Sequence, residues 1–170
     1  YGHADATLTV SESTVSGNVA SNVGGGIHSY NYNGYATYEY GTAVITNVVN
    51  STISGNSANV SGGGITSDGS HLTLTNATVA YNQSAYGGGI HAYESYNSYL
   101  GSAIASPLLA HNAIITNNSL NDGTTASDVV GDIDFSNLSS HNLIGPGGSA
   151  GLVDDDANDN IVLTTSENSG

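Results

Sequence analysis

The sequence of 170 residues contains no lysine, arginine, cysteine, methionine or tryptophan. The absence of cysteine excludes a disulfide scaffold and thiol chemistry. The absence of lysine and arginine removes every fixed positive side chain, so neither nucleic acid nor an anionic membrane surface is an expected partner. No apolar run approaches the roughly 20 residues of a membrane-spanning helix, and we expect no membrane insertion. Because methionine is missing, we expect a processed chain or a segment of a longer one.

Acidic residues dominate the charge of the chain. The 14 aspartates and glutamates give a formal net charge of −14, and without basic partners they must be solvated, hydrogen-bonded or neutralised by cations. The densest acidic group offers closely spaced oxygen ligands of the kind that calcium prefers. This candidate metal site comprises Asp154, Asp155, Asp156, Asn158 and Asp159. Calcium is the one cofactor we expect, and the alternative is an exposed acidic turn without a metal.

Four eleven-residue segments, which begin at Leu8, Thr46, Leu72 and Leu108, align without gaps. One column is β-branched throughout, and three positions later every segment has an asparagine. The β-branched column comprises Val15, Ile53, Val79 and Ile115. The asparagine column comprises Asn18, Asn56, Asn82 and Asn118. In the first three segments a Gly-Gly-Gly-Ile sequence follows, and self-similarity of this kind indicates a repeat architecture.

These columns predict the fold. Short runs of β-branched residues and threonine favour strands, whereas glycine and asparagine tolerate the left-handed backbone of tight corners. If successive coils stack about 4.8 Å apart, the β-branched column is buried and the asparagine amides bond from coil to coil. We therefore predict an all-β, right-handed parallel β-helix, a solenoid of about five or six coils without helices. A β-sandwich of short strands is the alternative, but it does not require the same residue in the same column four times.

We expect residues 1–170 to form a single β-helix domain. Residues 1–118 contain the regular repeats, and residues 119–170 contain less regular, acidic closing coils. Within this closing part we expect strands over 128–135, 140–145 and 161–165, followed or separated by loops.

Two insertions interrupt the repeats after the glycine triplets, at Ser29–Ala43 and Ala92–Ala103. They contain eight of the 11 tyrosines: Tyr30, Tyr32, Tyr35, Tyr38, Tyr40, Tyr93, Tyr96 and Tyr99. Both insertions leave the same corner, so we expect them to project from one side, roughly 10 Å apart. Tyrosine combines a large apolar ring with a polar tip, which suits interfaces and the stacking of sugars. We therefore predict a binding face, the alternative being that these rings pack on the flank of the solenoid.

The repeat and closing sequences together resemble a known class of proteins. The unit Asn50–Ile65 resembles the repeats of bacterial surface proteins of the polymorphic outer-membrane-protein and right-handed β-helix families. Four closing segments resemble the end of such arrays in proteins of the choice-of-anchor type: Ser127–Gly131, His141–Gly145, Gly148–Leu152 and Asn160–Val162. The resemblance implies a right-handed solenoid displayed outside the cell, with no family-wide enzymatic activity. The chain departs from the family at the acidic stretch 154–160, where an uncharged loop is usual.

Enzymatic activity is not expected. Lyases with this fold typically use an arginine or lysine base, which the chain lacks. The carboxylates whose spacing fits the paired acids of a glycoside hydrolase are Asp128, Asp132 and Asp134. We interpret them as a solvated acidic corner and assign no catalytic residue. His28 and His91 occupy equivalent positions on either side of Thr66, so we expect them roughly 10 Å apart, too far to share a zinc ion.

The expected function follows from the fold. An uncapped solenoid presents unpaired strand edges at its ends, and such edges favour association. We therefore expect an extracellular structural protein, a solenoid subunit that stacks end to end through self-association into a fibre or surface layer. The alternative is an adhesin or glycan-binding module of a larger surface protein. Six Asn-x-Ser/Thr sequons are present, and only those whose side chains face solvent are candidates for glycosylation.

Overall fold

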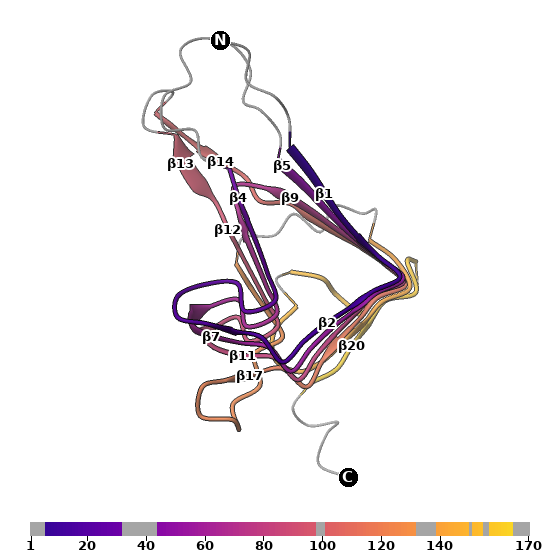
Figure 1. Ribbon diagram of the computed structural model, residues 1–170. Coiled ribbons are helices and arrows are strands. Elements are labelled where there is room, and N and C mark those ends of the chain that lie inside the picture. Colours follow the sequence, from indigo (N-terminus) through magenta and orange to yellow (C-terminus); the bar gives the residue numbers. More distant parts are fainter. Residues whose placement is uncertain are drawn as a thin grey trace.

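The computed structural model of the protein describes residues 6–31, 44–97, 101–131, 139–149, 151–154 and 157–164. These residues contain strands, turns and bends and no helix, so none of them forms a helix that could span a membrane. The all-β class predicted from the sequence is confirmed. Figure 1 shows the strands as stacked layers of nearly parallel segments.

Four parallel sheets make up the fold. The first contains β1 (Ala6–Ser11), β5 (Val44–Val49), β9 (His71–Thr75) and β15 (Leu108–His111). The second contains β2 (Thr14–Ser16), β6 (Thr52–Ser54), β10 (Thr78–Ala80), β16 (Ile114–Thr116), β19 (Leu143–Ile144) and β20 (Ile161–Val162). The third contains β3 (Val19–Ala20), β7 (Ser57–Ser61), β11 (Gln83–Tyr86) and β17 (Ser119–Leu120). The fourth contains β4 (Ile27–Tyr30), β8 (Ile65–Asp68), β12 (Ile90–Tyr93) and β18 (Val129–Gly131).

The order of these strands along the chain defines a β-solenoid. From β1 to β12 the chain visits the four sheets in turn and then returns to the first sheet beside its previous strand. The insertion after β12 holds an antiparallel hairpin of β13 (Ser95–Asn97) and β14 (Ser102–Ile104). In Figure 1 this hairpin extends beyond the end of β12, away from the second and third sheets.

The β-branched residues of the second sheet stack in register along the solenoid. This column runs through Val15, Ile53, Val79, Ile115, Ile144 and Val162. Its four middle members have no exposed surface, and full burial of each such side chain contributes about 1.5–3 kcal/mol. Parallel columns from the other sheets pack against it to form one continuous core.

The asparagines form a ladder beside this column. The Oδ1 atom of each asparagine accepts hydrogen bonds from the backbone N–H and the Nδ2 group of the asparagine one pass earlier. These bonds all measure 3.0 Å and run along Asn18, Asn56, Asn82 and Asn118. The last three asparagines are buried, and unpaired amides there would strongly destabilise the interior. The ladder therefore satisfies the polar groups at this corner and sets the register of adjacent passes.

The glycine triplets allow adjacent passes to approach closely. A Cβ atom added to Gly26 would lie 2.7 Å from the carbonyl oxygen of Gly64, and one added to Gly64 would lie 2.6 Å from that of Gly89. The backbone bonds from Gly26 N–H to Gly64 O and from Gly64 N–H to Gly89 O, both 3.0 Å, depend on this approach. Both positions therefore require glycine.

The closing part of the chain is less regular than the repeats. Strand β19 is shorter than the one expected over 140–145, and β20 ends at Val162, before the described residues 163 and 164 of the strand expected over 161–165. Of the strand expected over 128–135, β18 covers Val129–Gly131, and residues 132–135 lie outside the described residues. Isolated parallel bridges join His111 to Ser140 and Val129 to Ser149, so stacking continues beside these short strands. The difference arises because the long segment after β17 interrupts the regular spacing of the repeats.

Candidate functional site

The roots of the two tyrosine-rich insertions lie in register on the fourth sheet. Tyr30 pairs with Asp68, and Asp68 pairs with Tyr93, so the acidic residue lies between the two aromatic ones. Tyr30 is 47% exposed, and Tyr96 on the hairpin is 69% exposed. The remaining tyrosines of the predicted binding face lie outside the described residues: Tyr32, Tyr35, Tyr38, Tyr40 and Tyr99. The face as a whole therefore stays a prediction.

Asp68 is the buried carboxyl group of this column. Burial raises the pKa of Asp68 above its ordinary value of 3.8, although the hydrogen bond from the Tyr93 hydroxyl and the nearby His28 lower it. Burial also lowers the pKa of His91, against the attraction of Asp68. The His91 ring stacks on Tyr93 with centroids 4.8 Å apart. The fourth sheet thus carries a carboxyl in the column of Tyr30 and Tyr93, and an imidazole in the neighbouring column of His28 and Thr66, and the charged forms of both groups are disfavoured by burial.

The two histidines on this sheet are separated by one strand. His28 and His91 each pair with Thr66, whose buried hydroxyl donates to the carbonyl of Ser61 at 3.1 Å. Within the described ranges, no three histidine, aspartate or glutamate side chains are arranged to hold a metal ion.

The acidic stretch proposed for calcium is described only in part. Asp155 and Asp156 lie outside the described residues, while Asp154 and Asp159 are exposed. The Oδ2 atom of Asp159 lies 3.2 Å from Nε2 of His141, and the carbonyl of Asn158 accepts the His141 N–H at 2.8 Å. Calcium binding here remains a prediction.

Asp128 ends the asparagine ladder. Its Oδ1 atom accepts the Asn118 N–H at 3.0 Å and the Asn118 Nδ2 at 2.9 Å, and its Oδ2 accepts the Gly147 N–H at 2.9 Å. Burial raises the pKa of Asp128 despite these bonds. The interpretation of Asp128 as part of a solvated corner is wrong, because the chain folds back after β17 and places this carboxylate in the asparagine column. Asp132 and Asp134 lie outside the described residues.

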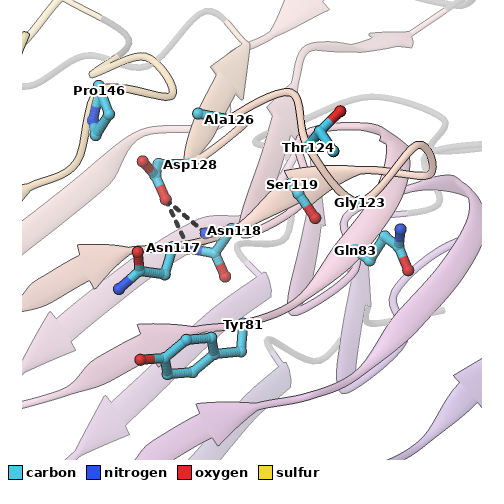
Figure 2. Close-up of a pocket in the computed structure, with 10 residues that line it drawn as sticks. All are labelled: Tyr81, Gln83, Asn117, Asn118, Ser119, Gly123, Thr124, Ala126, Asp128 and Pro146. Atoms are coloured by element: carbon cyan, nitrogen blue, oxygen red, sulfur yellow. Dashed lines mark hydrogen bonds between the residues drawn. The ribbon is translucent and has the colours of Figure 1, made fainter. Parts of the chain in front are cut away.

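A pocket of about 500 Å³ opens beside this end of the ladder. Figure 2 shows Asn118 and Asp128, joined by dashed hydrogen bonds, between Tyr81 on one side and Ala126 and Thr124 on the other. The pocket therefore lies where the corner after β10 and the segment after β17 face each other.

The turn after β17 forms a fixed wall of the pocket. The Asp122 carboxylate accepts the Thr125 hydroxyl at 2.6 Å, the Thr125 N–H at 2.8 Å and the Thr124 N–H at 2.9 Å. These bonds lower the pKa of Asp122 to about 2, and the bond from the Thr125 hydroxyl has the largest effect. The Nε2 group of Gln83 donates to the carbonyl of Leu120 at 3.0 Å, which attaches the turn to β11. The wall is thus held in place without any ligand.

Tyr81 occupies a corner that is glycine or asparagine on the other passes. Its φ of +59° matches those of Gly17 (+66°), Gly55 (+62°) and Asn117 (+57°). The left-handed conformation destabilises a residue with a side chain by roughly 1–2 kcal/mol, and asparagine tolerates it better than tyrosine. A Cβ atom at Gly17 would meet nothing within 4 Å, so side chains at this corner point outward. The Tyr81 side chain is accordingly 69% exposed and does not contribute to the core.

Neither Tyr81 nor the role of Asp128 was found from the sequence. A signal for Tyr81 was present, because the aligned repeats place it in the column of Gly17 and Gly55. No repeat signal marks Asp128, which follows its ladder partner Asn118 by 10 residues, whereas earlier ladder neighbours are 26 to 38 residues apart.

Among the described residues, the first strand of each sheet has a neighbouring strand on one side only, and we call this side its open edge. β1, β2, β3 and β4 are each outermost at the N-terminal end of the stack. Leu8 on β1 is 43% exposed and Val19 on β3 is 81% exposed, and Val15 on β2 is only partly buried. Edge strands with unpaired backbone groups favour pairing with further strands. These four edges are therefore a second candidate site, for association.

Comparison of the chain with protein-family models, with curated proteins and with solved structures finds no match. The resemblance to bacterial β-helical surface proteins therefore stays a prediction based on the quoted repeat and closing motifs. The features of the described chain that bear on function are the open edges, the aromatic column and the pocket.

Proposed function

We propose that the protein is an extracellular structural subunit, a right-handed β-solenoid of five or six coils that stacks end to end into a fibre or surface layer. The observation that carries this proposal is the set of four outermost strands, β1 to β4, with Leu8 and Val19 exposed on them. A further coil laid on these edges would pair their backbone groups and bury their apolar side chains. Both effects favour association.

The direction of the ladders supports head-to-tail stacking. A ladder on an exposed corner runs the other way, with Asn112 donating to Asn76 and Asn76 to Asn50. In the buried ladder, each Oδ1 after that of Asn18 accepts from the pass nearer the N-terminus, so the Oδ1 atom of Asn18 is placed to accept from an additional coil. The same direction holds near the other end, where Asn160 Oδ1 accepts the N–H and Nδ2 of Asn142 at 3.2 Å and 2.9 Å. Copies that continue this direction all point the same way. Such a contact does not close on itself and produces a filament.

The opposite end of the second sheet offers a counterpart to β2. β20 is outermost there, and its Ile161 is 53% exposed. The net charge of −14 makes copies repel one another, and added salt screens this repulsion. Association is therefore expected to strengthen as the ionic strength rises.

Sedimentation velocity over a range of protein and salt concentrations tests the proposal. The unmodified chain is expected to form assemblies that grow with both concentrations. Val19→Lys places a charge on the open edge and is expected to reduce assembly, because a lysine there opposes strand pairing. Val60→Lys is the matched control, since it makes the same charge change at a residue 46% exposed on β7, which lies between β3 and β11 and away from both ends of the stack. A chain that stays monomeric at every concentration would contradict the proposal.

A glycan-binding module of a larger surface protein is the second candidate function. The register of Tyr30, Asp68 and Tyr93 favours it, because this places aromatic rings on one side of the fourth sheet. If the chain is a module of a larger surface protein, further coils of the same polypeptide would cover the edges of β1 to β4. A glycan array with Tyr30→Ala and Tyr96→Ala variants tests this function, and equal binding by all three proteins would oppose it.

Calcium remains the proposed cofactor for the acidic stretch 154–160. Several carboxylates close together bind a divalent cation more readily than a single one does. Melting temperatures measured with calcium and with a chelator test the proposal, and equal values would remove it.

A further inference from the structure

The pocket beside Asp128 contains unused hydrogen-bonding groups. Within the described chain, the Asn117 side-chain amide, the Ser119 hydroxyl and the Tyr81 hydroxyl bond to no other protein group. A volume of about 500 Å³ falls in the range of small-molecule sites. The hydrogen bond from Asn118 to Asp128 holds the floor of the pocket in place, and the hydrogen bond from Thr125 to Asp122 holds one wall. The pocket is thus a preformed cavity with donors and acceptors available to a ligand.

Tyr81 places an aromatic ring at the rim of the pocket, and its backbone has a left-handed conformation that is strained for a residue with a side chain. Its ring is exposed, so packing does not account for a tyrosine in a left-handed corner where Gly17 and Gly55 stand on other passes. Strained residues that contribute nothing to the core cluster at ligand sites. The strain therefore points to a contact made by the ring with something outside the chain.

The combination of groups indicates the class of ligand. The flat face of a tyrosine packs against the C–H face of a sugar ring, while amides and hydroxyls bond to the sugar hydroxyls. The chain has no lysine or arginine to bind an anionic group, and Asp128 lines the pocket with a carboxylate. A sugar acid or a phosphorylated ligand would be repelled by this charge.

We propose that this pocket binds an uncharged oligosaccharide, with one sugar ring stacked on Tyr81 and its hydroxyls bonded by Asn117 and Ser119. The site is separate from the tyrosine-rich insertions, which leave the fourth sheet, and from the open edges of β1 to β4. It would allow a solenoid to attach to a neutral polysaccharide through its side.

Isothermal titration calorimetry with defined hexasaccharides tests this site. The probes are the neutral cellohexaose, laminarihexaose, mannohexaose and chitohexaose, with hexagalacturonate as the acidic comparison. The protein is prepared without glycosylation, because Asn117 begins an Asn-x-Ser sequon and an attached glycan would occupy the same space. At least one neutral probe is expected to bind, and hexagalacturonate is not.

Variants at the corner separate binding from folding. Tyr81→Gly places the residue of the neighbouring corners at this position, so the melting temperature is expected to be unchanged or higher while affinity falls about tenfold or more. Tyr81→Phe is expected to retain binding, and Tyr86→Ala, which removes a similarly exposed ring outside the pocket, to leave it unchanged. The proposal is overturned if no neutral probe binds at millimolar concentration. It is also overturned if Tyr81→Gly binds as tightly as the unmodified chain.

Discussion

At the scale of single residues, Thr46 is a polar residue in a column whose neighbouring members are leucines. Thr46 lies between Leu8 and Leu72 in the first sheet and is fully buried, yet its hydroxyl bonds to no group in the described chain. A buried hydroxyl without a partner destabilises the folded state. Thr46 is therefore a residue whose polar group opposes folding.

Thr46→Val is expected to raise the free energy of unfolding by about 1 kcal/mol, because valine keeps the shape and removes the unpaired hydroxyl. Chemical denaturation measures the change. Thr78→Val, at a half-buried position of β10, is the control and should change stability by less than about 0.5 kcal/mol. Equal effects of the two substitutions would show that the unpaired hydroxyl is not the cause.

Asp128→Asn is expected to lower the free energy of unfolding by about 1–3 kcal/mol. All the groups around the carboxylate are N–H donors, from Asn118 and Gly147, so an amide would direct one N–H group at another. Asp154→Asn removes an exposed carboxylate and serves as the control. Thermal unfolding of both variants provides the comparison, and a fully stable Asp128→Asn chain would refute the capping role.

The raised pKa of Asp68 predicts a pH dependence of stability. Because the folded pKa exceeds the ordinary value of 3.8, the folded chain binds the proton more tightly, and stability is greatest below that value and falls as pH rises through the raised pKa. Protonation of His91, whose pKa is lowered, opposes this trend below about pH 6.5. Asp68→Asn is therefore compared with the unmodified chain at each pH, and its relative stability should increase from pH 4 to pH 8. A difference that is independent of pH would contradict the burial of this charge.

Residue columns could be predicted wherever the repeats align. The aligned β-branched and asparagine positions coincide with the strand register, because stacking in a solenoid forces equivalent residues into contact. Asp128 could not be placed in this way, since it reaches the asparagine column through an irregular segment. The left-handed conformation of Tyr81 was predictable, because the aligned repeats place Tyr81 in the column of Gly17 and Gly55.

At the scale of elements, glycine triplets and short strands determine how closely the passes stack. Strand spacing in a sheet is about 4.8 Å, and the triplets bring backbone to backbone where the third sheet leads into the fourth. The strands of the regular repeats follow the predicted units, whereas β19 and β20 are shorter than expected. Alternation of residue types indicates a strand but does not reveal where long connecting segments interrupt its pairing.

Gly64→Ala is expected to destabilise the fold by about 1–3 kcal/mol or more, since the added Cβ would lie 2.6 Å from the carbonyl oxygen of Gly89. Gly55→Asn is the matched control. Gly55 has a φ of +62°, a Cβ atom added there would meet only one atom, at 4.0 Å, and asparagine already occupies the same corner at Asn117. Thermal denaturation should show a large loss for the first variant and little change for the second, and the reverse order would contradict the close-approach argument.

At the scale of the whole molecule, the solenoid is an acidic rod, and in the part of the chain that the structure describes β1 to β4 are outermost at its N-terminal end. The sequence predicted edges in general but could not show which residues they expose, because that depends on how the outermost strands lie. The structure identifies Leu8 and Val19 there and shows that the hydrogen bonds of the buried asparagine ladder all run in one direction. Charge opposes association and the open edges favour it, so the balance depends on salt.

Electron microscopy of the purified chain, at high protein concentration and moderate salt, tests end-to-end stacking most directly. Five or six coils at about 4.8 Å each predict unbranched fibres, one solenoid wide, with an axial repeat of roughly 25–30 Å. Under the same conditions Val19→Lys should give few or no fibres and Val60→Lys should give normal ones. A field of single, unassociated particles from the unmodified chain would contradict the proposed function.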